Sequence, residues 1–371
     1  MKVLLIGFTK IAYMPYIHFY INQLHKTNSE IILIYWDRDG KPDVEPPRGV
    51  NVLKFSDNMS DSESMAKKMP HFMRFRKYVK NVIKENDFDL ILVLHSTPGV
   101  LLYDILTKKY SRKYILDYRD VTYENFKLYK KIIHGLVDHS IATFVSSDAF
   151  RAHLPTKNNI YTSHNVLLDS LKNRDIRRYL PRDNQPIRIR YWGFIRHEEI
   201  NKRIITRLAN DSRFELHYHG REQKTAYILR QYCKELGINN VFFHGEYKPD
   251  DRYEFAKETD ILHNLFENDK VMKPAMANKF YDGIVFYIPQ LCNEGSFMGQ
   301  KVETAGIGIA LDPNKENFAD LVFEYYNSLN WEDFNVMCDD TLKKVVAEYN
   351  EGTKRIQDIL TEREYSSMFQ Q

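Results

Sequence analysis

The 371-residue sequence has few cysteines and no long apolar run, and each absence excludes a class of protein. Its three cysteines, Cys233, Cys292 and Cys338, lie far apart and in no metal-ligand spacing, so we expect reduced thiols and no structural zinc. No apolar stretch approaches the roughly 20 residues that span a bilayer. The first ten residues turn polar too early for a secretory signal, which predicts a cytoplasmic protein.

Nucleotide and nucleic-acid motifs are also scarce. Gly7 follows the first apolar run, but no G-x-G-x-x-G accompanies it, so the sequence gives dinucleotide binding little support. The basic stretch at residues 67–84 comes with no nucleic-acid recognition motif, and we expect no nucleic-acid partner.

The charge is unevenly distributed along the chain. The net charge is +3, but residues 1–180 hold 28 Lys and Arg against 19 Asp and Glu, and the remainder holds 25 against 31. The first half is therefore about +9 and the second about −6. Such an asymmetry predicts that the first half faces an anionic partner.

Short apolar runs alternate with helical stretches throughout the sequence. Six such runs occur in each half, beginning at residues 3, 30, 89, 113, 140 and 159, and at residues 187, 214, 240, 260, 288 and 306. Nearly continuous apolar strands between helices are typical of parallel sheets covered on both faces. We therefore predict two doubly wound α/β domains that face a cleft.

The boundary between the domains is expected in the polar, proline-containing segment 170–186. This divides the chain into a domain at 1–180, a second domain at 181–335, and a helical segment at 336–371 that packs back on the first domain. Ligands of such sheets bind beyond the carboxyl ends of the strands.

The segment Ala277–Pro289, ANKFYDGIVFYIP, carries the strongest functional signal. It predicts a helix that begins at Asn278 and Lys279, places Asp282 in its first turns, and leads into an apolar strand. A helix N-terminus offers free N–H groups and partial positive charge to a phosphate. A nearby carboxylate can accept hydrogen bonds from sugar hydroxyls. The alternative is an ordinary amphipathic helix before a buried strand.

A second candidate for phosphate binding is YWGFIRHEEINKR, which starts at Tyr191. Gly193 permits close backbone approach, and Arg196 and Lys202 flank the start of the next helix, with Arg203 as a substitute. A guanidinium and an ammonium there would form a diphosphate clamp. The alternative is a solvated helix face.

These segments resemble the donor-site motifs of GT-B glycosyltransferases, especially the retaining, family 4-like enzymes of bacterial capsule and O-antigen pathways. Their pattern "sKlfeyla.G.Pvi" places an acid seven residues before the proline, as Asp282 stands before Pro289. Their "G-R-x-x-x-x-K" motif resembles the Gly193 segment, although Arg196 is three residues after the glycine. The resemblance implies that the second domain binds a nucleoside-diphosphate sugar.

The resemblance also implies residues around the sugar and the base. The loop after Gly245 would cover the base, with Tyr247 stacking on it. The family's Glu-x7-Glu pattern would place its first acid at Pro274, which departs from the pattern and leaves Glu267 as the nearest upstream carboxylate.

In the first domain, polar residues follow two apolar runs. His95 ends DLILVLH, and KYILDYRD ends in three further candidates for proton transfer from an acceptor hydroxyl, Asp117, Arg119 and Asp120. Capsule-type enzymes resemble this chain at both places, and Asn165 matches an asparagine before their interdomain linker. Gly7 and Asn165 are therefore assigned to the acceptor side. The alternative is an Asp–Arg pair that caps a loop, beside a structural histidine.

Residues 67–84 contain seven Lys or Arg and no acid, with apolar residues at helical spacing. A basic amphipathic helix can bind an anionic membrane through side chains such as Arg74, Arg76, Lys77 and Lys80. The alternative is a helix that packs on the sheet and exposes its basic residues.

Together these features predict a hexosyltransferase. The resemblance alone implies that the enzyme retains the anomeric configuration of the transferred sugar. Its partners would be a nucleotide sugar and a glycan acceptor, such as an undecaprenyl-diphosphate-linked glycan at the inner membrane face. The cationic clamp predicts no metal and no cofactor. Two rivals stay open: a GT-B-fold sugar-nucleotide 2-epimerase, which needs no acceptor, and a non-catalytic glycan- or nucleotide-binding protein.

Overall fold

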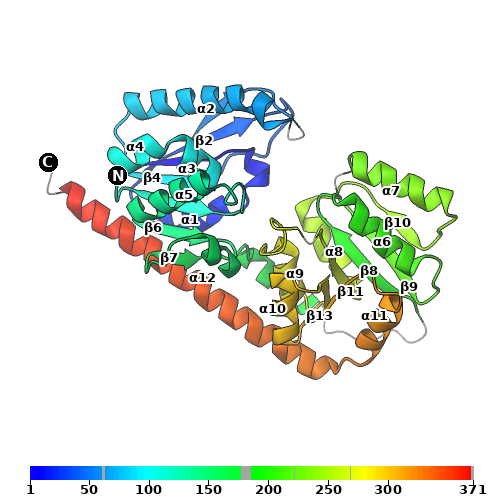
Figure 1. The fold of residues 1–371 in the computed structure, drawn as a ribbon. Helices are drawn as coiled ribbons and strands as arrows, with labels where there is room; N and C mark the ends of the chain where they lie inside the picture. Colours follow the sequence, from blue (N-terminus) through cyan, green and yellow to red (C-terminus); the bar gives the residue numbers. More distant parts are fainter. Residues whose placement is uncertain (61–62, 177–184, 221, 268, 369–371) are drawn as a thin grey trace. The chain divides into compact units, whose positions relative to one another are not determined.

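The computed structural model describes residues 1–60, 63–176, 185–220, 222–267 and 269–368 (Figure 1). The chain divides into two compact units. The first unit comprises Met1–His164 and Ala347–Gln371, and the second comprises Asn165–Val346. The units therefore meet in sequence at residues 164 and 346, where we expected 180 and 335. Residues 177–184 of the expected boundary lie outside the described part of the chain.

The first unit is built on a seven-stranded sheet with the order β3-β2-β1-β4-β5-β6-β7. All neighbouring strands are parallel. Its strands are β1 (Lys2–Ile6), β2 (Glu30–Asp37), β3 (Val50–Ser56), β4 (Leu90–Leu94), β5 (Tyr114–Tyr118), β6 (Ala142–Val145) and β7 (Ile160–Thr162).

The second unit holds a six-stranded parallel sheet with the order β10-β9-β8-β11-β12-β13. Its strands are β8 (Ile187–Trp192), β9 (Phe214–His219), β10 (Val241–Phe243), β11 (Ile261–Asn264), β12 (Gln290–Asn293) and β13 (Gly308–Leu311). The two doubly wound parallel sheets predicted from the sequence are confirmed, and all twelve predicted strands are present. The additional strand, β3, was missed.

Helices connect the strands of both sheets (Figure 1). In the first unit these are α1 (Ile17–Leu24), α2 (Met65–Glu85), α3 (Ser96–Leu101), α4 (Tyr103–Lys108) and α5 (Lys127–His139). In the second they are α6 (Glu198–Leu208), α7 (Lys224–Glu235), α8 (Arg252–Lys257), α9 (Asn278–Val285), α10 (Phe297–Ala305) and α11 (Phe318–Asn327). None of the described helices is both long enough and apolar enough to cross a membrane.

Helix α12 (Trp331–Met368) ends the chain and returns to the first unit from Ala347 onward. Its Tyr349 ring packs edge-on against Phe19 of α1, with ring centroids 5.0 Å apart. Gln357 donates a hydrogen bond of 2.7 Å to the side chain of Gln23. The C-terminal part of α12 therefore belongs to the core of the first unit.

Each sheet has one point at which the order of its strands reverses direction. In the first unit it lies between β1 and β4, and in the second between β8 and β11. The loops that leave these strands diverge to opposite faces, so each pair leaves a crevice beyond the carboxyl ends of the strands. The candidate residues of both units follow the carboxyl ends of strands of these sheets, among them β4, β5, β8, β10 and β11.

Candidate functional site

The loop after β8 exposes its backbone at Gly193. This residue has φ +128°, which side chains strongly disfavour, and the position of a Cβ atom there is open, with nothing within 4 Å. Gly220, at φ +154°, supports the loop from below, because a Cβ atom there would lie 1.6 Å from the carbonyl oxygen of Gly193. Two glycines thus fix a backbone segment that a ligand can approach closely.

Lys279 is a buried cation of the second unit. It lies in the first turn of α9, is 7% exposed, and its Nζ is 3.6 Å from the centroid of the Tyr191 ring and 4.8 Å from that of Phe266. Among the described residues no carboxylate forms an ion pair with it. Burial, reinforced by the nearby charge of Arg196, holds the pKa of the Lys279 ammonium well below its usual value.

Asp282 lies three residues further along α9, and its carboxylate contacts two other side chains of the same unit. Its Oδ2 accepts a 2.9 Å hydrogen bond from Nε1 of Trp192, and Oδ1 lies 3.8 Å from Nη1 of Arg252. Burial raises the pKa of Asp282, and the Arg252 charge opposes that rise. The carboxylate therefore ties the end of β8 to α8 and α9. It keeps acceptor capacity for a ligand hydroxyl, because a carboxylate offers about four lone-pair positions.

An aromatic group borders this carboxylate. The Tyr247 ring packs edge-on against Phe255 at 5.2 Å, and Phe255 in turn contacts Trp192 at 5.4 Å. Burial, together with the negative charge of Asp282, raises the pKa of Tyr247 to about 12. Gly245, at φ +81°, opens the loop that carries Tyr247. Tyr247 and Asp282 are therefore close enough to interact electrostatically, and their roles toward a ligand stay predictions.

The turn into α6 adds an imidazole that the sequence analysis overlooked. His197 caps α6 with φ +65°, and its buried Nε2 has no hydrogen-bond partner among the described residues. Burial and the charge of Arg196 lower the pKa of His197 to about 4, so the ring is neutral at pH 7. The side chain of Asn201 donates to the carbonyls of Arg196 and His197, at 2.8 Å each, and so fixes this turn.

Three further residues predicted to bind the donor have surroundings that differ from one another. Lys202 is paired with Glu198 at 2.5 Å and lies 5.7 Å from the centroid of the Tyr232 ring on α7, so its contacts are with α6 and α7. Asn278 is the first residue of α9 and is exposed. Glu267, in the loop after β11, lines a small cavity with Phe266 and Lys273.

In the first unit, the loops after β4 and β5 bring His95 and Asp120 together. Nε2 of His95 lies 3.5 Å from Oδ2 of Asp120, whose side chain is 61% exposed. The backbone N–H of Thr97 donates to Nδ1 of His95 at 3.2 Å. This bond favours the neutral tautomer with its proton on Nε2, directed at Asp120.

Asp117 and Arg119 form a different kind of pair. Nε of Arg119 lies 2.7 Å from Oδ1 of Asp117, and the two side chains are 5% and 1% exposed. The guanidinium also lies over the Tyr16 ring, 4.2 Å from its centroid. Burial raises the pKa of Asp117, and Arg119 opposes that rise. In this structure the pair joins β5 to the loop before α1, beneath the exposed Asp120.

Gly7 and Asn165 were assigned to the acceptor side, and the structure shows the surroundings of each. A Cβ atom on Gly7 would lie 2.6 Å from Cε of Met14, so the space beside this glycine is filled by the protein's own loop. Asn165 is the first residue of the second unit and is half-buried. A ligand role for either residue stays a prediction.

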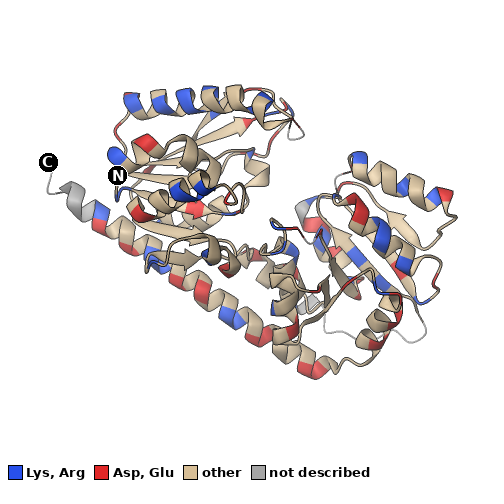
Figure 2. Ribbon diagram, in the orientation of Figure 1, with Lys and Arg blue, Asp and Glu red and all other residues tan. Residues whose placement is uncertain are grey.

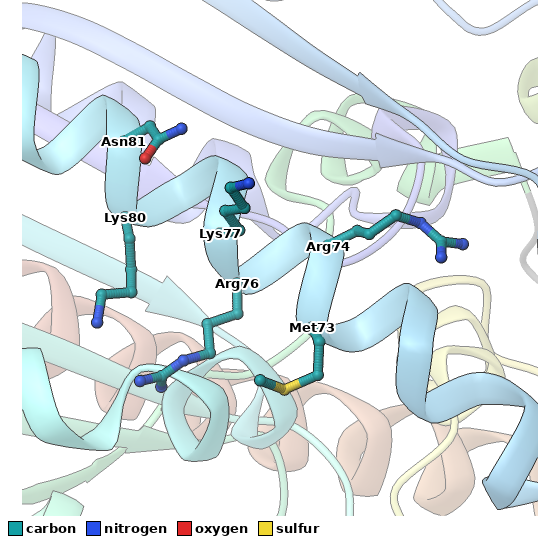
Figure 3. A pocket seen from close by; sticks show the side chains of 6 residues that line it. All are labelled: Met73, Arg74, Arg76, Lys77, Lys80 and Asn81. Atoms are coloured by element: carbon teal, nitrogen blue, oxygen red, sulfur yellow. The ribbon is translucent and has the colours of Figure 1, made fainter.

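Helix α2 is confirmed as a basic amphipathic helix, with Phe72, Phe75, Val79, Val82 and Ile83 on its buried face. Figure 3 shows Arg76 and Lys80 extending to one side of the helix, where both approach Asp104 at 3.0 and 3.4 Å. Arg74 is paired with Asp57 at 2.8 Å. Of the four basic residues selected from the sequence, three therefore pair with carboxylates of the same unit, Arg76 and Lys80 sharing one.

No protein-family model and no curated protein matches the chain. Solved structures do match over nearly its whole length. A sucrose-phosphate synthase from Thermosynechococcus elongatus is 11% identical with a TM-score of 0.70, and covers 100% of this chain and 99% of its own. WaaG, a glycosyltransferase of lipopolysaccharide biosynthesis, is 11% identical with a TM-score of 0.65, covering 96% and 99%.

A third similar structure is a UDP-GlcNAc 2-epimerase from Methanocaldococcus jannaschii in complex with UDP-GlcNAc and UDP. It is 12% identical with a TM-score of 0.58, and covers 94% of this chain and 100% of its own. At sequence identities this low, a structural match informs only about the fold. The three structural matches and the two parallel sheets confirm the predicted GT-B fold.

Proposed function

We propose that the protein is a glycosyltransferase that moves a sugar from a nucleoside-diphosphate sugar to a glycan or lipid-linked glycan in surface-polysaccharide synthesis. The observation that supports it most is the buried ammonium of Lys279, which has no carboxylate partner among the described residues. A buried cation without a counter-ion is costly for the folded protein. Such a cost is expected where an anionic ligand supplies the missing charge.

The donor is proposed to bind in the second unit. Lys279, Arg196 and the free N–H groups at the start of α9 would contact the diphosphate, with the neutral His197 donating or accepting one further hydrogen bond. Asp282 and Tyr247 would contact the ribose, sugar or base. As the diphosphate leaves, these fixed donors would stabilise its developing charge.

The acceptor is proposed to bind in the first unit, at the pair formed by His95 and Asp120. Asp120 would take the proton of the attacking hydroxyl, and His95 would orient the carboxylate through its Nε2 proton. The buried pair of Asp117 and Arg119 would support this loop. Retention of configuration is part of the proposal on the resemblance alone, and the anomeric form of the product tests it.

A sugar-nucleotide 2-epimerase is the second candidate, because one of the similar structures is such an enzyme. An epimerase converts its nucleotide sugar without any acceptor. Incubating the protein with labelled nucleotide sugars, with and without a glycan acceptor, separates the two reactions. Release of nucleoside diphosphate that depends on the acceptor supports the transferase, whereas an epimerised nucleotide sugar formed without acceptor supports the alternative.

Replacing Arg196 by alanine tests the diphosphate clamp. We expect kcat/KM for the nucleotide sugar to fall roughly 10- to 100-fold, because one charge-assisted hydrogen bond to a charged group is worth about 1.5–3 kcal/mol. Lys234→Ala is the control, since Lys234 is an exposed cation on α7 of the same unit. Equal kinetics of the two variants would remove Arg196 from the clamp.

Chelation tests how the diphosphate is neutralised. If Lys279, Arg196 and the start of α9 supply the positive charge, turnover in EDTA should equal that in buffer containing magnesium or manganese. The measurement is the initial rate after extensive treatment with the chelator. A rate that disappears with EDTA and returns with added metal would assign the diphosphate to a metal ion.

We further propose that the protein acts at the inner membrane face, as a cytoplasmic protein bound peripherally to anionic lipid, where an undecaprenyl-diphosphate-linked acceptor would reside. The net charge of about +9 carried by residues 1–180 is compatible with such contact. The ion pairs of Arg74, Arg76 and Lys80 reduce what these three residues can contribute.

A further inference from the structure

The start of α5 exposes two large apolar side chains. Phe126, the N-cap residue, is 67% exposed and Leu128 is 72% exposed, more than any other large apolar side chain in the described part of the chain. Ile133, Leu136 and Val137, further along this helix, are buried. Phe126 and Leu128 are therefore not needed to attach α5 to the unit.

The segment that carries these side chains is held firmly. Glu124, 7% exposed, accepts a 2.6 Å hydrogen bond from the Tyr118 hydroxyl and a 2.5 Å hydrogen bond from the N–H of Thr122. The Tyr129 hydroxyl donates to Ser96 at 3.4 Å, next to His95. These bonds fix the loop after β5, so Phe126 and Leu128 stay outside and close in sequence to the candidate acceptor residues.

Three lysines accompany the apolar pair. Lys127, Lys130 and Lys131 form no ion pair with any described residue, and residues 125–137 contain no Asp or Glu. Figure 2 marks Lys and Arg positions in blue along the ribbons of α5 and α2 in the first unit. On α2, three of the basic residues have carboxylate partners, Asp57 for Arg74 and Asp104 for Arg76 and Lys80. The start of α5 therefore combines three lysines that form no ion pair among the described residues with the two most exposed large apolar side chains.

We infer that this α5 patch, formed by Phe126, Lys127, Leu128, Lys130 and Lys131, docks the first unit onto an anionic lipid surface. Exposed apolar side chains between lysines suit an interface, because the apolar groups enter the acyl boundary while the ammonium groups remain among the headgroups. A membrane there would present a lipid-borne acceptor near His95 and Asp120. The inference deepens the membrane part of the proposed function.

Vesicle co-sedimentation without any nucleotide sugar tests the α5 patch, so its outcome is distinct from that of the transferase assay. The full chain is mixed with phosphatidylcholine vesicles, with or without phosphatidylglycerol. We expect binding to the anionic vesicles only, weakening as salt rises. Phe126→Ser/Leu128→Ser and Lys127→Gln/Lys130→Gln/Lys131→Gln should each reduce the partition coefficient by roughly 10-fold or more.

The control is an α2 variant, Met69→Ser/Met73→Ser/Lys77→Gln, which changes exposed residues of a neighbouring basic helix and leaves the ion pairs to Asp57 and Asp104 intact. It should bind vesicles like the wild type. Thermal unfolding and circular dichroism establish that every variant is folded. The inference is overturned if the wild type ignores anionic vesicles, if folded α5 variants bind them normally, or if only the α2 variant loses binding.

Discussion

Replacing Lys279 by methionine is expected to weaken the binding of a nucleoside diphosphate about 100-fold and to leave the protein at least as stable as the wild type. The ammonium is buried between Tyr191 and Phe266, without an ion pair among the described residues. A charge-assisted contact in such surroundings is worth about 3 kcal/mol to an anionic ligand. Methionine preserves the apolar stem and removes only the charge.

The effect of pH on stability provides a second readout for Lys279. Burial lowers the pKa of Lys279 in the folded protein, whereas an unfolded lysine has a pKa of about 10.4. Between these two values the unfolded chain binds more protons, so the free energy of unfolding rises with pH across that window. In Lys279→Met this rise should be smaller. Urea denaturation at several pH values measures it.

Ligand binding should show the complementary dependence on pH. A bound diphosphate favours the charged ammonium, so binding takes up a proton and the affinity should increase as the pH falls through the same window. Isothermal titration in buffers of different ionisation enthalpy detects that uptake. Lys202→Met is the matched control, because Lys202 is paired with Glu198 on α6 and should change neither affinity nor proton uptake.

Unchanged nucleotide affinity in a folded Lys279→Met variant would contradict the donor site proposed for the second unit. A loss of affinity that Lys202→Met reproduces would do so as well, since the effect would then follow net charge and not the position of the lysine.

The fold was accessible from the sequence because buried parallel strands are nearly continuous apolar runs. The exception was β3, VNVLKFS, which is an edge strand paired only with β2. Its residues alternate between half-buried and exposed, so its sequence lacks the apolar run that identified the other strands. The position of α9 and its link to β12 was predicted because Asn278, Lys279 and the following apolar residues form a clear start.

The sequence did not show which side chains the candidate residues contact. Trp192 and Asp282 are hydrogen-bonded across 90 sequence positions, and Arg252 approaches the same carboxylate from α8. Only the packing of α8 and α9 on the sheet creates that contact. Similarly, Lys202 and Lys279 look alike in sequence, but a glutamate one turn away pairs with the first and no described carboxylate pairs with the second.

Asp117, Arg119 and Asp120 illustrate the same limit. All three lie at or just after the end of β5, yet Asp117 and Arg119 are buried as a pair and Asp120 is largely exposed. The sequence located the loop correctly at the carboxyl edge of the sheet. It could not rank three charged residues that differ mainly in burial, and the structure favours Asp120 as the one that can meet an acceptor.

Asp120→Asn is therefore expected to reduce kcat roughly 100-fold, the lower end of the range for loss of a positioned proton acceptor. Asparagine keeps the size of the side chain and offers an oxygen to Nε2 of His95, which lies 3.5 Å from Oδ2 of Asp120 in the wild type, but it cannot take a proton. Binding of the nucleoside diphosphate should not change, because the residues proposed to bind it belong to the second unit.

The measurements for Asp120→Asn are steady-state transfer to a glycan acceptor and calorimetric binding of the diphosphate. Asp87→Asn is the control, since Asp87 is a fully exposed carboxylate of the same unit. His95→Ala should lower kcat less than Asp120→Asn does. His95 is proposed only to orient the carboxylate through its Nε2 proton, whereas Asp120 itself accepts the proton of the acceptor hydroxyl. Wild-type turnover by Asp120→Asn, or a larger loss of kcat in His95→Ala, would show that Asp120 is not the proton acceptor. If Asp120 were the base, removing it could not cost less than removing the residue that positions it.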